Sequence, residues 1–220
     1  MHLFNWLPEN IASYGHEMDR LMWVIYYVVG VWFLLAEGLV FYFILRYRRK
    51  QGVAAAYVTG RGLKAACWVL VPAILVLVCD FAIDARGEAV WRHIKLEIPT
   101  PDVQVRIEAR QFAWMFRHAG PDGKFDTADD VVTNGELHVP IGKVVRFELV
   151  SRDVIHSLWI PNLRLKQDAV PGRTIPGWFK AEKVGTYGIG CAQICGAGHT
   201  VMGATLVVQE QRDYDEWLKK

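Results

Sequence analysis

The sequence lacks a strong excess of charge of either sign. Its 25 basic and 23 acidic residues leave a formal net charge of +2, and the hairpin segment formed by residues 46–64 alone holds enough basic residues to account for that excess. A nucleic-acid-binding domain carries a concentrated basic surface, and the rest of this chain is nearly balanced. We therefore expect no nucleic-acid partner.

Cysteine is also scarce, with 4 in 220 residues, so a disulfide framework is excluded. Cys67 and Cys79 fall in an apolar stretch, whereas Cys191 and Cys195 lie close together near the carboxyl end. Only the second pair has polar and metal-binding neighbours. Any cysteine chemistry is therefore expected there.

Long apolar runs are present in the first half of the chain. Residues 21–45 contain one charge, Glu37, and at about 1.5 Å per residue a helix of that length crosses a hydrocarbon core of about 30 Å. Residues 65–83 form a second run, with Pro72 inside it and Asp80 near its end; a membrane helix tolerates such a proline. The sequence therefore predicts two membrane spans.

The flanking charges predict how these spans are oriented. No Lys or Arg precedes Arg20, so we expect no cleaved leader. Residues 46–64 are basic and contain no acid, which predicts a cytoplasmic loop. The expected organisation is an outward-facing segment (1–20), a transmembrane hairpin (21–86) and an exported domain (87–220).

An ionisable group inside a membrane is a functional candidate by default, and for Glu37 we favour packing against a polar partner subunit over proton transfer.

After residue 91 the pattern changes to short runs rich in Val, Ile and aromatic residues, separated by Gly and Pro. Two of these runs are VQVRIEARQFAWMFRH and KVVRFELVS, and we interpret each as one strand. Apolar residues alternate with polar ones at Val103, Val105 and Ile107 in the first and at Val145, Phe147 and Leu149 in the second, so one face of each strand should be buried. Frequent turn signals throughout the chain after residue 91 are typical of an all-β Greek-key sandwich or barrel. The final residues, DYDEWLKK, predict a short helix capped near Asp213.

Residues 120–131, GPDGKFDTADDV, interrupt the strands with a cluster of acids. Such oxygen-rich segments can bind calcium, but the spacing does not match the D-x-[DN]-x-[DN]-G loop. We favour a solvated hairpin tip over a calcium site.

The segment GCAQICGAGHTVM concentrates soft metal ligands: Cys191, Cys195, His199 and Met202. Two cysteines four residues apart could close a disulfide, and with two histidines they could bind zinc, although zinc leaves Met202 unused. A mononuclear blue-copper site needs one thiolate, so the second cysteine would be surplus. Two thiolates, two imidazoles and a thioether suit two copper ions best.

The second imidazole must come from outside this segment, and His156 is the best candidate of the 7 histidines. It lies in DVIHSLWIP among apolar residues, which would give a metal site of low dielectric. Taken alone, such a histidine is more often a neutral core residue. The neighbouring ligand segment favours the metal-binding interpretation.

These features together resemble subunit II of the haem-copper cytochrome c oxidases. The resemblance rests on two apolar spans, Q-F-x-W-x-F, DVIHSLWIPNLRLKQDAVPGR and GTYGIGCAQICGAGHTVMGATLVV, and it covers nearly the whole chain. It implies a cupredoxin-like β barrel, anchored by the transmembrane hairpin, with a dinuclear copper centre of the CuA type. No residue of this chain is expected to be catalytic, because oxygen is reduced at haem in subunit I.

The resemblance also implies a role for each ligand. Cys191 and Cys195 would bridge two copper ions, one completed by His199 and the backbone carbonyl of Gln193, the other by His156 and Met202. The implied partners are subunits I and III, membrane lipid, and cytochrome c or a similar small donor. The implied location is the bacterial inner membrane, in preference to the mitochondrial one, with the copper domain on the periplasmic side.

Two departures from the family pattern fall in the exported domain. Gln193 replaces a glutamate that reaches a magnesium ion at the subunit I interface, and since an amide is a weaker ligand, we expect weak magnesium binding. Phe112 replaces a tryptophan at the electron-entry surface. We interpret Phe112 as the entry residue and Trp114 as packing beside it, while ordinary strand aromatics remain an alternative.

Two other functions stay open at this point. A membrane-anchored copper-delivery protein usually has one copper and one anchor, so five ligand side chains argue against it. A copper-containing subunit of a nitric oxide reductase would share the ligand set.

Overall fold

The computed structural model of the chain describes residues 7–57 and 59–219, so the first six residues of the predicted outward-facing segment lie outside the described part. The chain divides into two compact units, one of residues 17–91 and one that joins the amino-terminal segment to residues 92–220.

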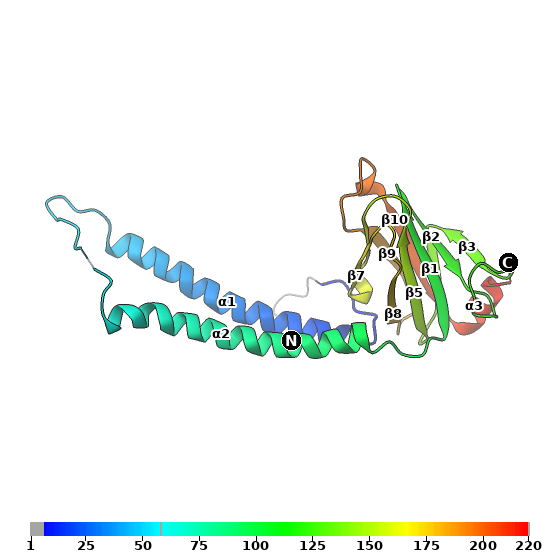
Figure 1. Cartoon of the computed structure of the whole chain (residues 1–220), viewed down its shortest axis with the longest axis horizontal. Helices are drawn as coiled ribbons and strands as arrows, with labels where there is room; N and C mark the ends of the chain where they lie inside the picture. Colours follow the sequence, from blue (N-terminus) through cyan, green and yellow to red (C-terminus); the bar gives the residue numbers. More distant parts are fainter. Residues whose placement is uncertain (1–6, 58, 220) are drawn as a thin grey trace. The chain divides into compact units, whose positions relative to one another are not determined.

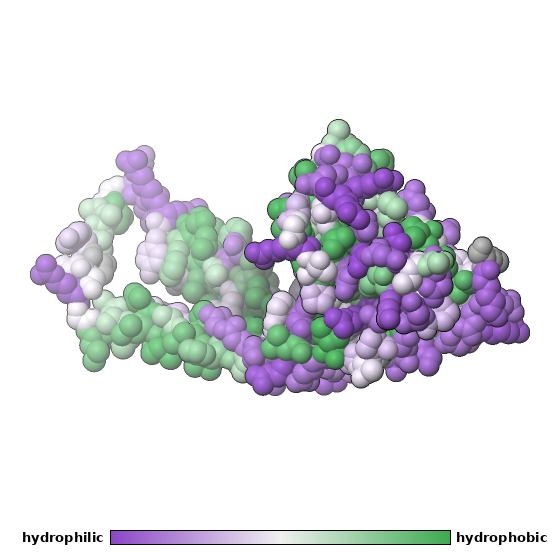
Figure 2. All heavy atoms as spheres, turned by 45° about the vertical axis from the view of Figure 1, so that its right-hand side comes forward, coloured by the Kyte–Doolittle hydropathy of each residue, from purple (hydrophilic) through white to green (hydrophobic). Residues whose placement is uncertain are grey.

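The first unit consists of two long apolar helices, α1 (Gly15–Arg46) and α2 (Leu63–Trp91) (Figure 1). Both extend beyond the predicted spans, and Pro72 lies inside α2. No residue of α2 is buried, and hydrophobic side chains cover the surface of the two helices (Figure 2). In water this much exposed apolar area would be unfavourable, whereas lipid is a suitable solvent for it.

The second unit is a β sandwich made of two five-stranded sheets. Its ten strands are β1 (Val103–Arg110), β2 (Ala113–His118), β3 (Val131–Asn134), β4 (Glu136–Pro140), β5 (Val144–Ser151), β6 (His156–Ile160), β7 (Leu165–Ala169), β8 (Ile175–Lys180), β9 (Gly185–Cys191) and β10 (Gly203–Gln209). Short helical turns lie at η1 (Arg92–Leu96), η2 (Pro161–Leu163) and η3 (His199–Val201), and α3 (Gln211–Trp217) ends the domain.

The sheets have the strand orders β3-β2-β1-β5-β8 and β4-β10-β9-β6-β7. All described pairs are antiparallel except β1 with β5 and β4 with β10. The expected alternation is confirmed, because Val105 and Ile107 on β1 and Phe147 and Leu149 on β5 are wholly buried between the sheets. The fold class, two apolar helices followed by a cupredoxin-like all-β domain, is therefore confirmed.

Two local expectations were wrong. The run VQVRIEARQFAWMFRH is two strands, since the chain turns at Gln111 and Phe112 and β2 pairs back on β1 with Arg110 opposite Ala113. Strong β propensity on both sides of a two-residue turn hides the turn. The last helix begins at Gln211 and its N-cap is Glu210, without a side-chain cap hydrogen bond, so Asp213 lies inside it.

Residues 11–14 add a short edge to the sandwich. The amide of Ile11 donates to the carbonyl of Asn162 (2.9 Å), and its own carbonyl accepts from Glu182 (2.8 Å). Tyr14 is buried and packs edge-on against Trp178, with ring centroids 5.3 Å apart. The segment just before α1 is therefore held by the same β domain that follows α2.

Candidate metal centre

The metal-ligand candidates meet at one end of the sandwich. His156 is the first residue of β6 and Cys191 the last of β9, and the pairing of Leu158 with Cys191 brings those strand ends together. The connection from β9 to β10 carries the remaining candidates, and it is the orange segment at the top of the β domain in Figure 1. We call this end of the domain the copper end.

The six candidate ligand atoms form a continuous chain of contacts. The Sγ atoms of Cys191 and Cys195 are 3.9 Å apart. The Cys191 Sγ lies 4.0 Å from His156 Nδ1 and 3.2 Å from the Gln193 carbonyl oxygen. The Cys195 Sγ lies 3.7 Å from His199 Nδ1 and 3.8 Å from Met202 Sδ. Residues from two strands and one connection are thus gathered around a single point.

The sulfur separation fits a metal and not a disulfide. An S–S bond is about 2.05 Å long, so Cys191 and Cys195 are two free thiols. Metal–thiolate bonds are about 2.3 Å, as for zinc, and two sulfurs 3.9 Å apart can therefore both bind one ion. Within residues 7–57 and 59–219, His156, Cys191 and Cys195 form the one cluster of three or more His, Cys, Asp or Glu ligands.

Burial favours a bound cation at this site. His156, Cys195 and Met202 are buried, whereas Gln193 is exposed. Burial and the adjacent Cys191 thiol raise the pKa of Cys195 to about 11. Two neighbouring thiolates are therefore unfavourable at neutral pH unless a positive ion lies between them. The donor set, rich in sulfur with two imidazoles, suits copper.

Asp153 fixes the orientation of the His156 ring. Its Oδ1 lies 2.8 Å from His156 Nε2, which leaves Nδ1 directed at the thiols. The same carboxylate accepts the backbone N–H groups of Gln111 and Val154, each at 2.7 Å. A carboxylate behind a ligand histidine selects its tautomer and holds its ring.

Sequence reasoning missed this role of Asp153, although a signal was available. An acid three residues before a histidine, across a turn that opens a strand, can reach back to the ring. The second missed residue is Gln111, whose side-chain amide donates to the backbone carbonyl of Cys195.

Phe112 and Trp114 occupy different positions at the copper end. We call the connection between β9 and β10, residues 192–202, the copper segment. Phe112 lies on the β1–β2 turn, is 38% exposed, and its ring packs so closely on the copper segment that a Cβ at Gly198 would lie 2.5 Å from it. Trp114 is wholly buried, with its ring centroid 6.2 Å from that of His156. Gly196 has φ +134° and also faces Phe112, so a side chain there is unfavourable for two reasons.

The acidic hairpin lies elsewhere and its carboxylates are already engaged. Arg106 pairs with Asp126 at 2.8 Å, and Arg117 pairs with Asp130 at 3.1 Å. Asp130 also accepts the backbone N–H of Asp126 at 2.7 Å. These contacts favour a hairpin held by arginine over one that binds calcium.

Comparison with known proteins agrees with this geometry. A family model described as cytochrome c oxidase subunit II, periplasmic domain, matches residues 121–210. Over its whole length the chain is 31% identical to the alternative cytochrome c oxidase subunit 2 of Bradyrhizobium diazoefficiens, of which it covers 86%. The chain belongs to the cytochrome c oxidase subunit II family.

Other relatives carry the same description. The chain is 28% identical to cytochrome c oxidase subunit 2 of Thermostichus vulcanus, covering all of this chain and 79% of that one. A solved periplasmic domain of subunit II from Bradyrhizobium japonicum is 30% identical, covers 56% of this chain and 95% of its own, and superposes with a TM-score of 0.49.

Family membership, the two apolar helices and the His/Cys/Cys cluster establish the outline of function. The protein is subunit II of a terminal oxidase and a component of an oxidoreductase complex. It is membrane-anchored with a periplasmic domain, and it binds copper.

Proposed function

We propose that this subunit holds two copper ions in a CuA-type centre, accepts electrons from a cytochrome c, and passes them to haem in subunit I. The observation that carries the proposal is the pair of free thiols 3.9 Å apart, each with its own additional donors. His156 and the Gln193 carbonyl lie next to one thiol, and His199 and Met202 next to the other. A single ion would leave part of this donor set unused.

In this proposal Cys191 and Cys195 would hold the two ions together with the remaining four donors. Copper would supply the one-electron redox chemistry. The residues supply rigidity, because His156 and Met202 are buried on or beside strands and Asp153 holds the His156 ring. A site that changes shape little between redox states transfers electrons with little reorganisation. The weak donors, Met202 and the Gln193 carbonyl, would tune the potential more than the affinity.

Phe112 is the proposed entry point for electrons. Its ring is partly exposed and packs against the copper segment through Gly196 and Gly198. Trp114, buried beside His156, would act from within by fixing the packing behind that ligand.

We also propose that α1 and α2 both cross the bacterial inner membrane. Residues 11–14 pair with the same domain that follows α2, so the chain must leave that side and return to it, which requires an even number of crossings. The basic residues 46–64 would then be cytoplasmic. The predicted segments 1–20, 21–86 and 87–220 follow from this topology.

Partner subunits are expected on two surfaces. The exposed side chain of Gln193 would face subunit I, where it offers magnesium a neutral oxygen and thus a weak ligand. The apolar helices, with Glu37 on α1, would pack against subunit I and subunit III.

Spin resonance of the purified oxidase tests the copper proposal. We expect about two coppers per chain and a hyperfine pattern of seven lines, because one electron shared by two copper nuclei couples to both equally. Cys195→Ser should abolish this pattern, whereas Cys67→Ser, at an exposed thiol of α2, should leave it intact. A four-line spectrum from the unmodified oxidase, or zinc in place of copper, refutes the proposal.

A further inference from the structure

The copper end of the domain exposes several apolar side chains directly beside the metal ligands. Ile194 is 80% exposed and precedes Cys195; Val201 is 79% exposed and precedes Met202. Ile155 precedes His156 and is also exposed, and Phe112 covers the copper segment from the β1–β2 turn. We call these four residues the apolar rim. Figure 2 shows hydrophobic residues reaching the tip of the β domain.

Apolar side chains this exposed, gathered around a redox centre, are typical of a surface that a partner covers. In a monomer they would cost free energy without contributing to the core. The charges around the rim then indicate which kind of partner fits.

The carboxylates at the copper end are already engaged. Glu108 pairs with Arg152 at 2.7 Å, and Asp153 holds His156. Farther from the rim, Asp168 lies 3.2 Å from Lys166, and Glu136 lies 3.2 Å from His138. Glu108 and Asp168 are thus neutralised by an arginine and a lysine, whereas Asp153 and Glu136 contact only histidines among the ionisable side chains. The described residues around the rim therefore offer isolated carboxylates and not the ring that a lysine-rich partner would require.

Two arginines, in contrast, have no such partner. Arg110 ends β1 next to the Phe112 turn, and Arg173 lies on the β7–β8 connection; both are exposed. Neither has an acidic side chain within ion-pair distance in the part of the chain that the structure describes.

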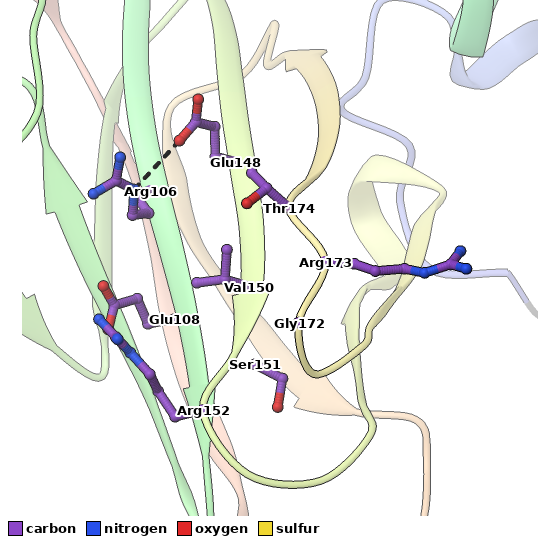
Figure 3. Close-up of a pocket in the computed structure, with 9 residues that line it drawn as sticks. All are labelled: Arg106, Glu108, Glu148, Val150, Ser151, Arg152, Gly172, Arg173 and Thr174. Atoms are coloured by element: carbon purple, nitrogen blue, oxygen red, sulfur yellow. Dashed lines mark hydrogen bonds and ion pairs between the residues drawn. The ribbon is translucent and has the colours of Figure 1, made fainter.

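A surface hollow of about 280 Å³ beside the copper end also combines paired glutamates with an unpaired arginine (Figure 3). Its two glutamates face Arg106 and Arg152 at short range, as the ion pairs Arg106–Glu148 (3.3 Å) and Arg152–Glu108 (2.7 Å) indicate. The side chain of Arg173 extends away from these pairs (Figure 3). The hollow thus adds positive charge and no free carboxylate.

We propose that the electron donor is a small redox protein whose docking face is apolar at its centre and neutral or acidic at its edge, unlike a lysine-ringed cytochrome c. This inference rests on the proposed function, because it names the partner of the same copper centre. Burial of the apolar rim against the donor stabilises the complex. Arg110 and Arg173 attract a donor with an acidic edge and repel one with a lysine-rich face.

Salt dependence of the oxidase complex tests the proposal with two probes. One is a mitochondrial-type cytochrome c with a lysine-rich face, the other a bacterial c-type cytochrome with an acidic face. Between low and moderate ionic strength, kcat/KM for the lysine-rich donor should stay within about threefold or rise, since salt screens repulsion. For the acidic donor it should fall by about threefold or more.

Two substitutions separate charge from apolar contact. Arg110→Glu should raise kcat/KM for the lysine-rich donor and lower it for the acidic one, each by about three- to tenfold. Ile194→Ser should lower kcat/KM for both donors by about tenfold, while the copper spectrum is retained. Val184→Ser is the matched control, because Val184 is an exposed apolar residue between β8 and β9 at the opposite end of the domain.

The outcomes distinguish this inference from the proposed function. If a small-molecule reductant reduces the copper but the lysine-rich donor loses activity steeply with salt, the donor inference alone is wrong. If Ile194→Ser leaves donor kcat/KM unchanged and instead slows electron transfer from copper to haem, the apolar rim is covered by subunit I and the inference is again overturned. Failure to find a dinuclear copper spectrum in the unmodified oxidase overturns the proposed function itself.

Discussion

The contact between Asp153 and His156 allows a quantitative test of how the metal site is held. The Asp153 carboxylate accepts three hydrogen bonds. Its Oδ2 accepts from the backbone N–H of Gln111, and its Oδ1 accepts from the backbone N–H of Val154 and from the His156 ring. Asp153→Asn keeps the shape of the side chain but replaces one oxygen with an NH₂ group, which donates and cannot accept.

Neither orientation of the asparagine restores all three bonds. With its oxygen toward His156, the NH₂ group faces the Gln111 N–H; with its oxygen toward Gln111, the NH₂ group faces the Val154 N–H and the ring. At least one donor is left opposite another donor in each case. Substitution of a residue that supports a ligand histidine typically lowers metal affinity by about 10- to 100-fold, and we expect copper affinity to fall within that range.

Competition with a copper chelator measures this effect, with the visible absorption of the site as the readout. Asp168→Asn is the matched control, since Asp168 accepts from Ser157 at 2.7 Å and contacts no candidate ligand. We expect less than about a twofold change there. If Asp153→Asn binds copper as tightly as the unmodified protein, the assigned orientation of the His156 ring is wrong.

Three further predictions concern pH, metal content and stability. Burial, and secondarily His138, lowers the pKa of His118 to about 3. In the unfolded chain this ring is protonated near pH 6.5, so acid favours the unfolded state. The free energy of unfolding should therefore be unaffected by this ring at pH 7 and fall below pH 6.5, by about 2 kcal/mol at pH 5. Denaturant unfolding should show this loss, and His118→Phe should flatten it. Gln193→Glu should leave copper content unchanged and raise bound magnesium in metal analysis; loss of copper would contradict the role given to the backbone carbonyl. Tyr14→Ala should destabilise the β domain by about 3–5 kcal/mol, as for other large buried aromatics, whereas Tyr57→Ala, at a side chain 91% exposed, should have no measurable effect on thermal unfolding.

Much of the fold could be predicted from local sequence patterns. Alternation in β1 and β5 identified Val105, Ile107, Phe147 and Leu149 as facing one side, and all four are wholly buried. The apolar runs marked α1 and α2, although not their ends. These patterns are readable because they reflect the periodicity of a single element, independent of what it packs against.

Pairing between distant segments could not be predicted in the same way. The amino-terminal segment pairs with residues more than a hundred positions later, such as Ile11 with Asn162, and nothing in its own composition indicates this pairing. Asp153 illustrates the same limit at the metal site. The ligand types were evident in the sequence, but the carboxylate that orients His156 is recognised only when the turn before β6 is seen.

The packing of Phe112 links the metal site to the surface where the donor is expected. Because a Cβ at Gly198 would lie 2.5 Å from the Phe112 ring, any larger residue at position 198 must displace that ring and disturb the copper segment as well. We therefore expect substitutions at this contact to change both metal binding and the electron entry proposed at Phe112. Arg110 and Ile194 are exposed and lie outside this packing, so donor preference can change there without loss of the copper centre. We therefore expect differences in donor between subunits of this type to lie at such exposed positions of the copper end.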